Sequence, residues 1–316
     1  MKLVVKALCV VAIFSCCACQ RASEHGAASR KIAFVMKTLN NPFFIDMQRG
    51  AEAAAKEHNV ELIVQAAERE LDVEKQMQII ENLIQARVGA LCVTPSGSRE
   101  ILPALAQANA ANIPVLIVDT RLDSAAAAES GVRYETFIGS DNFEGGRVAG
   151  EFLVARFNGT AKVAVLEGIP GHETGDSRLR GFRAALQAAP GMQIVASQTA
   201  NWERDQGFNV FQNLLQAHPD LDALFACNDM MALGALEALA AAGKAHQIAV
   251  VGFDAIDDAR QAIEAGTLAA SIAQSPEEMG RVAIASAVRV LRGEKLPGVI
   301  PVKIALVKKE NSASAE

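Results

Sequence analysis

The sequence has none of the features typical of a nucleic-acid-binding protein or of a metal enzyme. Its 316 residues carry a net charge of -6 and contain no basic cluster, whereas binding to phosphate groups requires a basic surface. The five histidines are scattered without the spacing that metal ligands need. We therefore expect no nucleic-acid partner and no metal ion, and no motif in the sequence indicates a cofactor.

Catalytic motifs are absent as well. The chain has no dinucleotide-binding glycine motif, no nucleophile elbow and no His-Glu-x-x-His pair. The run GIPGHETG, from Gly168 to Gly175, lacks the Gly-Lys-Ser/Thr ending of a phosphate loop, and we interpret it as a loop that lets Arg178 reach a cleft; the alternative is a solvated arginine. Acid–base catalysis would need two poised groups. Asp119 and Asp254 could form such a pair, but without a nucleophile or a metal set we expect no enzyme.

Few cysteines lie outside the amino terminus. Of the six in the chain, only Cys92 and Cys227 follow the first 19 residues, and each stands at the end of an apolar run. Two distant cysteines form no disulfide framework, so we predict two buried free thiols.

Residues 1–19 have the pattern of an export signal. Two lysines precede the apolar run ALCVVAIF, which is shorter than the roughly 20 residues needed to span a bilayer. The string IFSCCACQ at its end resembles a bacterial lipoprotein processing site, so we expect a lipid on Cys19 or Cys16. The polar residues 20–29 would then form a tether. The mature protein would lie in the periplasm or on the outer face of a membrane.

From Lys31 onward, short β-branched runs alternate with Ala-rich helical runs. This alternation predicts an α/β fold in which helices cover both faces of a parallel sheet. One doubly wound domain of this length would exceed the usual size of a single core. We therefore predict two similar Rossmann-like lobes with parallel sheets, a break between them near Ser140, and a last strand over residues 302–307.

The stretch KTLNNPFF, from Lys37 to Phe44, reads as the turn between a strand and a helix. Pro42 fixes the backbone where a helix would begin. The crevice outside the carboxyl ends of parallel strands is where ligands bind, and a cation, two carboxamides and two aromatic rings there suit a polyhydroxylated small molecule. The alternative is a plain helix start with both phenylalanines in the core.

Other polar residues also follow predicted strands. Each has an ordinary alternative, because Asp and Asn commonly cap helices, and for Asp229 and Asn142 we expect that role. Asp119 and Asp254 come after fully apolar strands, where an unpaired carboxylate would be costly, so we expect them to contact a ligand.

Taken together, these segments resemble the ribose- and allose-binding branch of the bacterial periplasmic sugar-binding proteins, a type I periplasmic binding protein family. The matching segments, in order, are KTLNNPFF, IGSDNFEGG, SQTANWERDQGFNVFQNLL, FACNDMMALGALEAL, VVGFDAIDDAR and SIAQSPEEMG. The resemblance implies two lobes joined by a three-stranded hinge, with crossings near Ser140, Gln274 and Lys303. One lobe would comprise 30–140 plus 275–303, and the other 141–274 plus 304–316.

The resemblance also implies a binding site and a function. The lobes would close on one monosaccharide and deliver it to an ABC importer. Phe43 and Phe44 would cover one face of the sugar and Trp202 the other, while Asn142 would line the hinge side of the cleft. The hydroxyls would be hydrogen-bonded by Asn41, Asp119, Arg178, Asn228, Asp254 and Gln274.

Two positions depart from the ribose-binding pattern. Lys37 stands where ribose binders have serine, and Asp119-Thr120 stands where they have Asp-Arg. Lys37 together with Trp202 is closer to the allose-binding pattern, so a pentose, a hexose or a polyol remains open. The alternatives to a transport receptor, expected as a monomer, are a co-receptor for chemotaxis or for a sensor kinase and, further off, a sugar-modifying enzyme.

Overall fold

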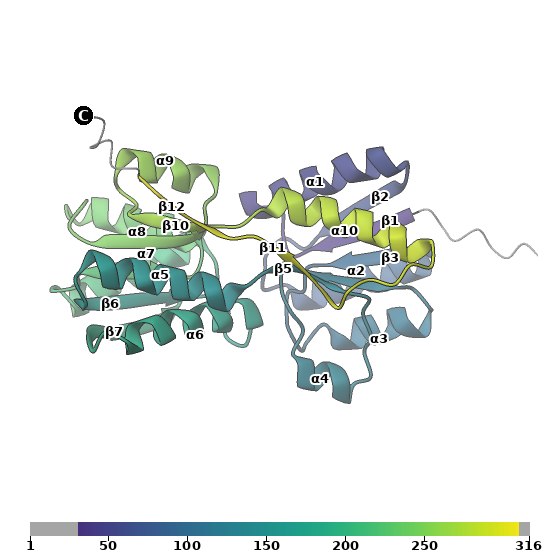
Figure 1. Cartoon of the computed structure of the whole chain (residues 1–316), viewed down its shortest axis with the longest axis horizontal. Helices are drawn as coiled ribbons and strands as arrows, with labels where there is room; N and C mark the ends of the chain where they lie inside the picture. The colour runs from purple at the N-terminus through teal and green to yellow at the C-terminus, as the bar shows by residue number, and fades with distance from the viewer. Residues whose placement is uncertain (1–30, 310–316) are drawn as a thin grey trace, which may run out of the picture.

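A computed structural model describes residues 31–309 of the chain. The predicted export signal, the tether, the candidate lipidated cysteines Cys16 and Cys19, and residues 310–316 lie outside this range. Between residues 31 and 309, two six-stranded sheets form two lobes that lie end to end (Figure 1). No helix in this part of the chain combines the length and the apolar character needed to cross a membrane. The predicted α/β fold with two Rossmann-like lobes is confirmed.

The first lobe is built on a fully parallel sheet with the strand order β11-β5-β4-β3-β1-β2. Its strands are β1 (Lys31–Met36), β2 (Glu61–Ala66), β3 (Ala90–Val93), β4 (Val115–Val118), β5 (Phe137–Ser140) and β11 (Val299–Val302). Its helices are α1 (Pro42–His58), α2 (Val73–Gln85), α3 (Leu102–Ala110), α4 (Ser124–Glu129) and α10 (Pro276–Leu291). The pair α1 and α10 covers one face of the sheet, and α2 and α3 cover the other (Figure 1).

The second lobe repeats this plan with the strand order β12-β10-β9-β8-β6-β7. Its strands are β6 (Thr160–Glu167), β7 (Gly191–Thr199), β8 (Ala223–Ala226), β9 (Ala249–Asp254), β10 (Ala270–Ala273) and β12 (Ala305–Lys308). Its helices are α5 (Asn142–Arg156), α6 (Glu173–Gln187), α7 (Arg204–Ala217), α8 (Asp229–Ala241) and α9 (Asp257–Ala265). Only the edge strand β12 is antiparallel to its neighbour, β10. The two remaining cysteines are buried and free, as predicted.

The described chain passes between the lobes after β5, after β10 and after β11. The third passage corrects the prediction of one strand over residues 302–307. The structure has two short strands here, β11 in the first sheet and β12 in the second, with Lys303 and Ile304 between them. One strand cannot pair with both sheets, so the apolar run must be interrupted where the chain crosses.

Glycines let paired helices approach until their backbones touch. A Cβ atom on Gly280 of α10 would lie 1.9 Å from the carbonyl oxygen of Met47 on α1. The second lobe repeats this arrangement, since a Cβ on Gly146 of α5 would lie 1.9 Å from the carbonyl oxygen of Arg178 on α6. The close approach of α5 and α6 therefore sets where the Arg178 side chain begins.

We predict that Gly280→Ala destabilises the first lobe. Alanine favours a helix interior over glycine by about 0.5–1 kcal/mol, but the backbone collision forces α1 and α10 apart, and overpacking of this kind costs about 1–3 kcal/mol. The net effect should be a melting temperature lower by several degrees in a thermal unfolding experiment. Gly298→Ala is the matched control, because no atom lies within 4 Å of its added Cβ. A Gly280→Ala variant as stable as this control would contradict the role of the glycine.

Candidate functional site

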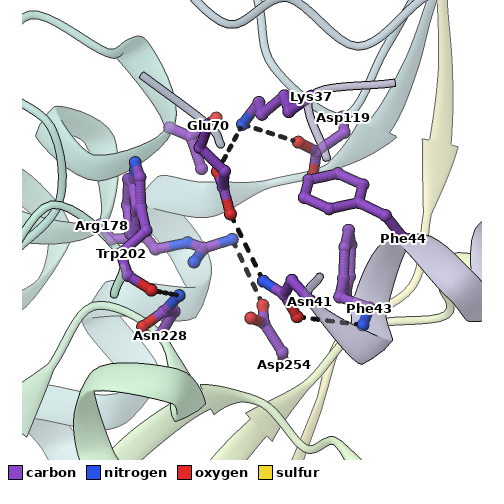
Figure 2. Close-up of a pocket in the computed structure, with 11 residues that line it drawn as sticks. Lys37, Asn41, Phe43, Phe44, Glu70, Asp119, Arg178, Trp202, Asn228 and Asp254 are labelled. Atoms are coloured by element: carbon purple, nitrogen blue, oxygen red, sulfur yellow. Dashed lines mark hydrogen bonds and ion pairs between the residues drawn. The ribbon is translucent and has the colours of Figure 1, made fainter. Parts of the chain in front are cut away.

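A cavity of about 270 Å³, counted to its opening, lies between the lobes (Figure 2). All predicted site residues except Asn142 and Gln274 line it. These are Lys37, Asn41, Phe43, Phe44, Asp119, Arg178, Trp202, Asn228 and Asp254. Glu70 and Thr174 also line the cavity and were not predicted. Each lobe contributes loops from the carboxyl ends of its strands, as expected for an open α/β sheet.

The turn between β1 and α1 places two aromatic rings on one side of the cavity. Asn41 caps α1 by accepting a hydrogen bond from the Phe43 backbone N–H at 3.1 Å. Phe43 and Phe44 then pack edge to face with ring centres 5.3 Å apart. Both rings belong to the apolar core of the protein and also line the cavity. The stretch is therefore both a helix start with phenylalanines in the core and part of the cavity wall.

Trp202 lies on the opposite side of the cavity from these phenylalanines (Figure 2). The glycine-rich loop after β6 makes room for its indole ring. A Cβ on Gly168 would lie 2.0 Å from Cζ2 of the ring, and a Cβ on Gly175 would lie 3.0 Å from the same atom. Arg178 does reach the cavity from the helix after this loop. Gly168 and Gly175 leave room for the Trp202 ring.

The first lobe carries a buried lysine between two carboxylates. The Lys37 ammonium lies 3.3 Å from Oδ2 of Asp119 and 3.7 Å from Oε2 of Glu70. The Thr120 hydroxyl donates to Asp119 at 3.0 Å, and the Asn41 side-chain amide lies 3.4 Å from Glu70. Burial raises the pKa of Glu70 above its ordinary value, and the Lys37 charge offsets part of that rise.

The second lobe holds a buried arginine in a fixed orientation. Nε of Arg178 donates to the side-chain oxygen of Asn142 at 2.8 Å, and Nη1 donates to the carbonyl oxygen of Cys227 at 2.6 Å. Its guanidinium stacks on Phe253, with Cζ 3.7 Å from the ring centre. Because Asn142 contacts Arg178 from behind, it orients the guanidinium and does not line the cavity.

Asp254 is the acidic partner of this arginine. Its Oδ1 lies 3.7 Å from Nη2 of Arg178 and accepts a hydrogen bond from the Gln274 side chain at 2.8 Å. Gln274 thus orients Asp254 from outside the cavity lining. Burial raises the pKa of Asp254 to about 7, although Arg178 and Gln274 both favour its ionised form.

Three of the lining residues adopt strained backbone angles. Asp119, Trp202 and Asp254 have φ angles of 65°, 69° and 110°, where side chains other than glycine are rare. Each such residue costs on the order of 1–3 kcal/mol and persists only where its surroundings hold it. These three side chains are therefore directed into the cavity at an energetic cost.

Two capping predictions are wrong. Asp141, and not Asn142, caps α5 by accepting from the Glu144 N–H at 3.0 Å. Asn228, and not Asp229, caps α8. Asp229 instead accepts from the Ile256 N–H and the Ser271 hydroxyl inside the second lobe. In each pair the neighbouring residue has an equally suitable side chain, and the position along the chain decides which one caps.

Direct contacts hold the two lobes together around the cavity. The hydroxyl of Thr174 donates to that of Thr120 at 3.0 Å, and the Glu173 N–H donates to the Ser98 hydroxyl at 3.1 Å. Arg69 and Glu203 form an ion pair at 3.5 Å nearer the solvent. These contacts describe a closed arrangement, in which most of the lining side chains are buried.

The two lining residues that sequence reasoning missed had a signal in the chain. Glu70 lies in the loop after β2, and Thr174 lies in the first turn of α6, the helix that follows the glycine-rich loop. Applying the strand-end rule to these segments would have included both. Across residues 31–309, no three His, Cys, Asp or Glu side chains gather in a way that could hold a metal ion.

The chain belongs to the periplasmic binding protein family. The family described as "Periplasmic binding protein domain" matches residues 32–295. Among curated proteins, the ribose import binding protein of Bacillus subtilis is 38% identical over 97% of this chain and 99% of its own length. The D-allose-binding periplasmic protein of Escherichia coli is 33% identical over 88% of this chain and 89% of its own length.

Solved structures agree with this membership. An ABC transporter periplasmic solute binding protein from Actinobacillus succinogenes, solved with bound D-allose, is 39% identical to this chain, with a TM-score of 0.84. The match covers 88% of this chain and 97% of the other. The relatives named here are described as sugar-binding or solute-binding proteins.

We predict that protonation of His172 destabilises the closed protein. Burial between the lobes, together with a smaller effect of the nearby Lys37 charge, lowers the pKa of His172 from its ordinary 6.5 to about 3. An unfolded chain takes up this proton below pH 6.5 and the folded one does not, so stability is complete above pH 6.5 and is lost as the pH falls toward 3. At pH 5 the loss should be about 2 kcal/mol.

The measurement compares the parent protein with His172→Gln by denaturant unfolding at pH 7.5 and pH 5. Between pH 7.5 and pH 5, the free energy of unfolding should fall further in the parent than in the variant, because glutamine has no proton to take up. Carboxylates titrate equally in both proteins and cancel. Parallel pH profiles would show that His172 contributes nothing to acid sensitivity.

Proposed function

We propose that the protein is an extracytoplasmic receptor that binds one monosaccharide between its lobes and delivers it to an ABC importer. The observation that carries this proposal is the arrangement of the cavity. Aromatic rings face each other from opposite lobes, and charged and amide groups lie between them (Figure 2). Rings pack on the apolar faces of a sugar, while carboxylates and an arginine fork hydrogen-bond its hydroxyls.

The size and polarity of the cavity favour a single small ring or an open polyol. Counted to its opening, the cavity has about 270 Å³, and its lining consists mostly of charged, amide and aromatic side chains. Relatives named for ribose and for D-allose both match this chain along most of its length. A pentose, a hexose or a polyol therefore all remain within the proposal.

We assign two kinds of role to the predicted site residues. Those that line the cavity contact the ligand: Lys37, Asn41, Phe43, Phe44, Asp119, Arg178, Trp202, Asn228 and Asp254. Asn142 and Gln274 lie behind them and hold Arg178 and Asp254 in position. The lobes, 30–140 plus 275–303 and 141–274 plus 304–316, would move about the three crossings when ligand enters or leaves.

Membership in a family of periplasmic binding proteins supports an exported location. We further propose a lipid anchor on Cys19 or Cys16, since an apolar run too short to span a bilayer is followed at once by cysteines and a polar tether. Cells grown with radioactive palmitate should yield a labelled protein, and replacing both cysteines by serine should remove the label. An unlabelled parent protein whose chain begins after Cys19 would contradict the anchor.

A co-receptor for chemotaxis or for a sensor kinase is the main alternative, because the same closed form could be recognised by a signalling partner. Deleting the gene separates the two roles, since it removes either uptake of the sugar or the response to it. A sugar-modifying enzyme would alter its ligand during incubation. We expect a monomer, and an unchanged ligand recovered after incubation.

We predict that Asp254→Ala and Arg178→Ala each weaken sugar binding without unfolding the protein. Each charge-assisted hydrogen bond is worth about 1.5–3 kcal/mol, and each side chain can make two, so affinity should fall by roughly tenfold to a thousandfold. Calorimetric titration with D-ribose, D-allose and a panel of pentoses, hexoses and polyols measures the effect. The emission of Trp202, the only tryptophan, should change with the same midpoint.

The matched controls are Asp257→Ala and Arg183→Ala, which remove exposed charges on α9 and α6. Both controls should bind as the parent does. A parent protein that binds no member of the panel would contradict the proposed function. Site variants within about threefold of the parent would contradict the assignment of these two residues.

A further inference from the structure

Glu70 occupies an unusual position in the cavity wall. It lies in the loop between β2 and α2, beyond the last strand residue, Ala66, and its side chain extends into the space between the lobes (Figure 2). It lines the central cavity and also a neighbouring cavity nearer the solvent. Only 6% of the residue is exposed. A carboxylate this deeply buried needs partners of its own.

The partners that the structure provides are distant. The Lys37 ammonium lies 3.7 Å from Oε2 of Glu70, and the Asn41 amide nitrogen lies 3.4 Å from Oε1. Hydrogen bonds from nitrogen to oxygen are normally 2.7–3.2 Å long. Both contacts exceed that range, while an ionised carboxylate has about four sites that can accept hydrogen bonds.

The other two carboxylates in the cavity are better satisfied. Asp119 accepts from the Thr120 hydroxyl at 3.0 Å, and Asp254 accepts from the Gln274 amide at 2.8 Å. Each therefore has at least one partner at normal distance within its own lobe. Glu70 has none, so the greatest unused capacity to accept hydrogen bonds in the cavity lies on this residue.

We propose that Glu70 determines specificity by accepting a hydrogen bond from a free hydroxyl of the bound sugar. This inference rests on the proposed function and extends it to the chemistry of the ligand. The Lys37 ammonium lies on the same side and donates to a neighbouring sugar oxygen. Together they require a neutral ligand with a free hydroxyl on this edge, and they disfavour analogues that are deoxygenated, methylated or acidic there.

The raised pKa of Glu70 agrees with a carboxylate whose donors are distant, since burial is its main cause. A hydroxyl donor would stabilise the ionised form and lower that pKa again. A site built to hydrogen-bond a hydroxyl discriminates strongly against analogues that lack it, because the buried acceptor is then left unpaired.

The experiment titrates the parent protein, Glu70→Gln and Glu70→Ala by calorimetry. The probes are D-ribose, D-allose and the panel of pentoses, hexoses and polyols named above, followed by the complete set of monodeoxy analogues of whichever binds most tightly. In the parent, one analogue should bind roughly tenfold to a hundredfold more weakly than the intact sugar because of a lost bond to Glu70. In Glu70→Ala that particular penalty should vanish, while penalties at other carbons persist. Glu70→Gln, which keeps an accepting oxygen, should give an intermediate penalty.

The control is Glu68→Gln, which removes an exposed charge from the same loop. It should reproduce the parent profile. Melting of each variant without sugar checks that the fold is intact, and Glu70→Gln should melt no lower than the parent, since it removes a poorly paired buried charge.

The outcomes separate this inference from the proposed function. A parent that binds no sugar or polyol of the panel overturns both. A parent that binds, with a Glu70→Ala variant whose deoxy profile is unchanged, overturns the role of Glu70 alone. A variant that loses affinity equally for the sugar and for every analogue shows a structural role for Glu70 and also overturns the inference.

Discussion

The cavity depends on keeping charged side chains away from water without leaving any of them unpaired. Removing a charge from water costs several kcal/mol unless a partner compensates. Each lobe supplies its own partners, since Lys37 lies between Asp119 and Glu70 in the first lobe and Arg178 faces Asp254 in the second. Within residues 31–309, no buried ion pair crosses the cleft, where the contacts are hydroxyl and backbone hydrogen bonds and an exposed ion pair. The lobes can therefore separate without leaving a buried charge alone.

Glycines at close contacts in the scaffold determine where Arg178 and Trp202 are placed. Arg178 reaches the cavity because α6 lies against α5 at a glycine, Gly146, where any side chain would collide with the backbone of Arg178 itself. Trp202 stands in the opposite wall because Gly168 leaves room for its ring. Glycine in a helix costs about 0.5–1 kcal/mol. At Gly146 this cost is offset by the close packing of α5 against α6, which fixes where the Arg178 side chain begins.

The sequence was most informative where one strong pattern acted alone. Asp119 and Asp254 could be placed in a cavity because each ends an apolar strand, and parallel strands bring their carboxyl ends together. Neighbouring residues with equal chemistry could not be distinguished. Asp141 caps α5 in place of Asn142, and Asn228 caps α8 in place of Asp229. The run 302–307 could not be divided, because alternation does not reveal which sheet a strand joins. Glu70 was missed because it lies further beyond the end of its strand, β2, than Asp119 or Asp254 lies from the end of its own, although it stands on the same kind of loop.

The charges that line the cavity constrain its ligand. The carboxylates are Glu70, Asp119 and Asp254, and the cations are Lys37 and Arg178, so fully ionised groups would leave an excess of one negative charge. Burial already raises the pKa of Glu70 and of Asp254, so both carboxylates are ionised in the cavity at a cost. An acidic ligand would add to it and would offer the unsatisfied carboxylate no proton to share. Hydroxyl groups add no charge, donate to the carboxylates and accept from the cations. A neutral polyhydroxylated molecule is therefore the ligand that best compensates this set of buried charges.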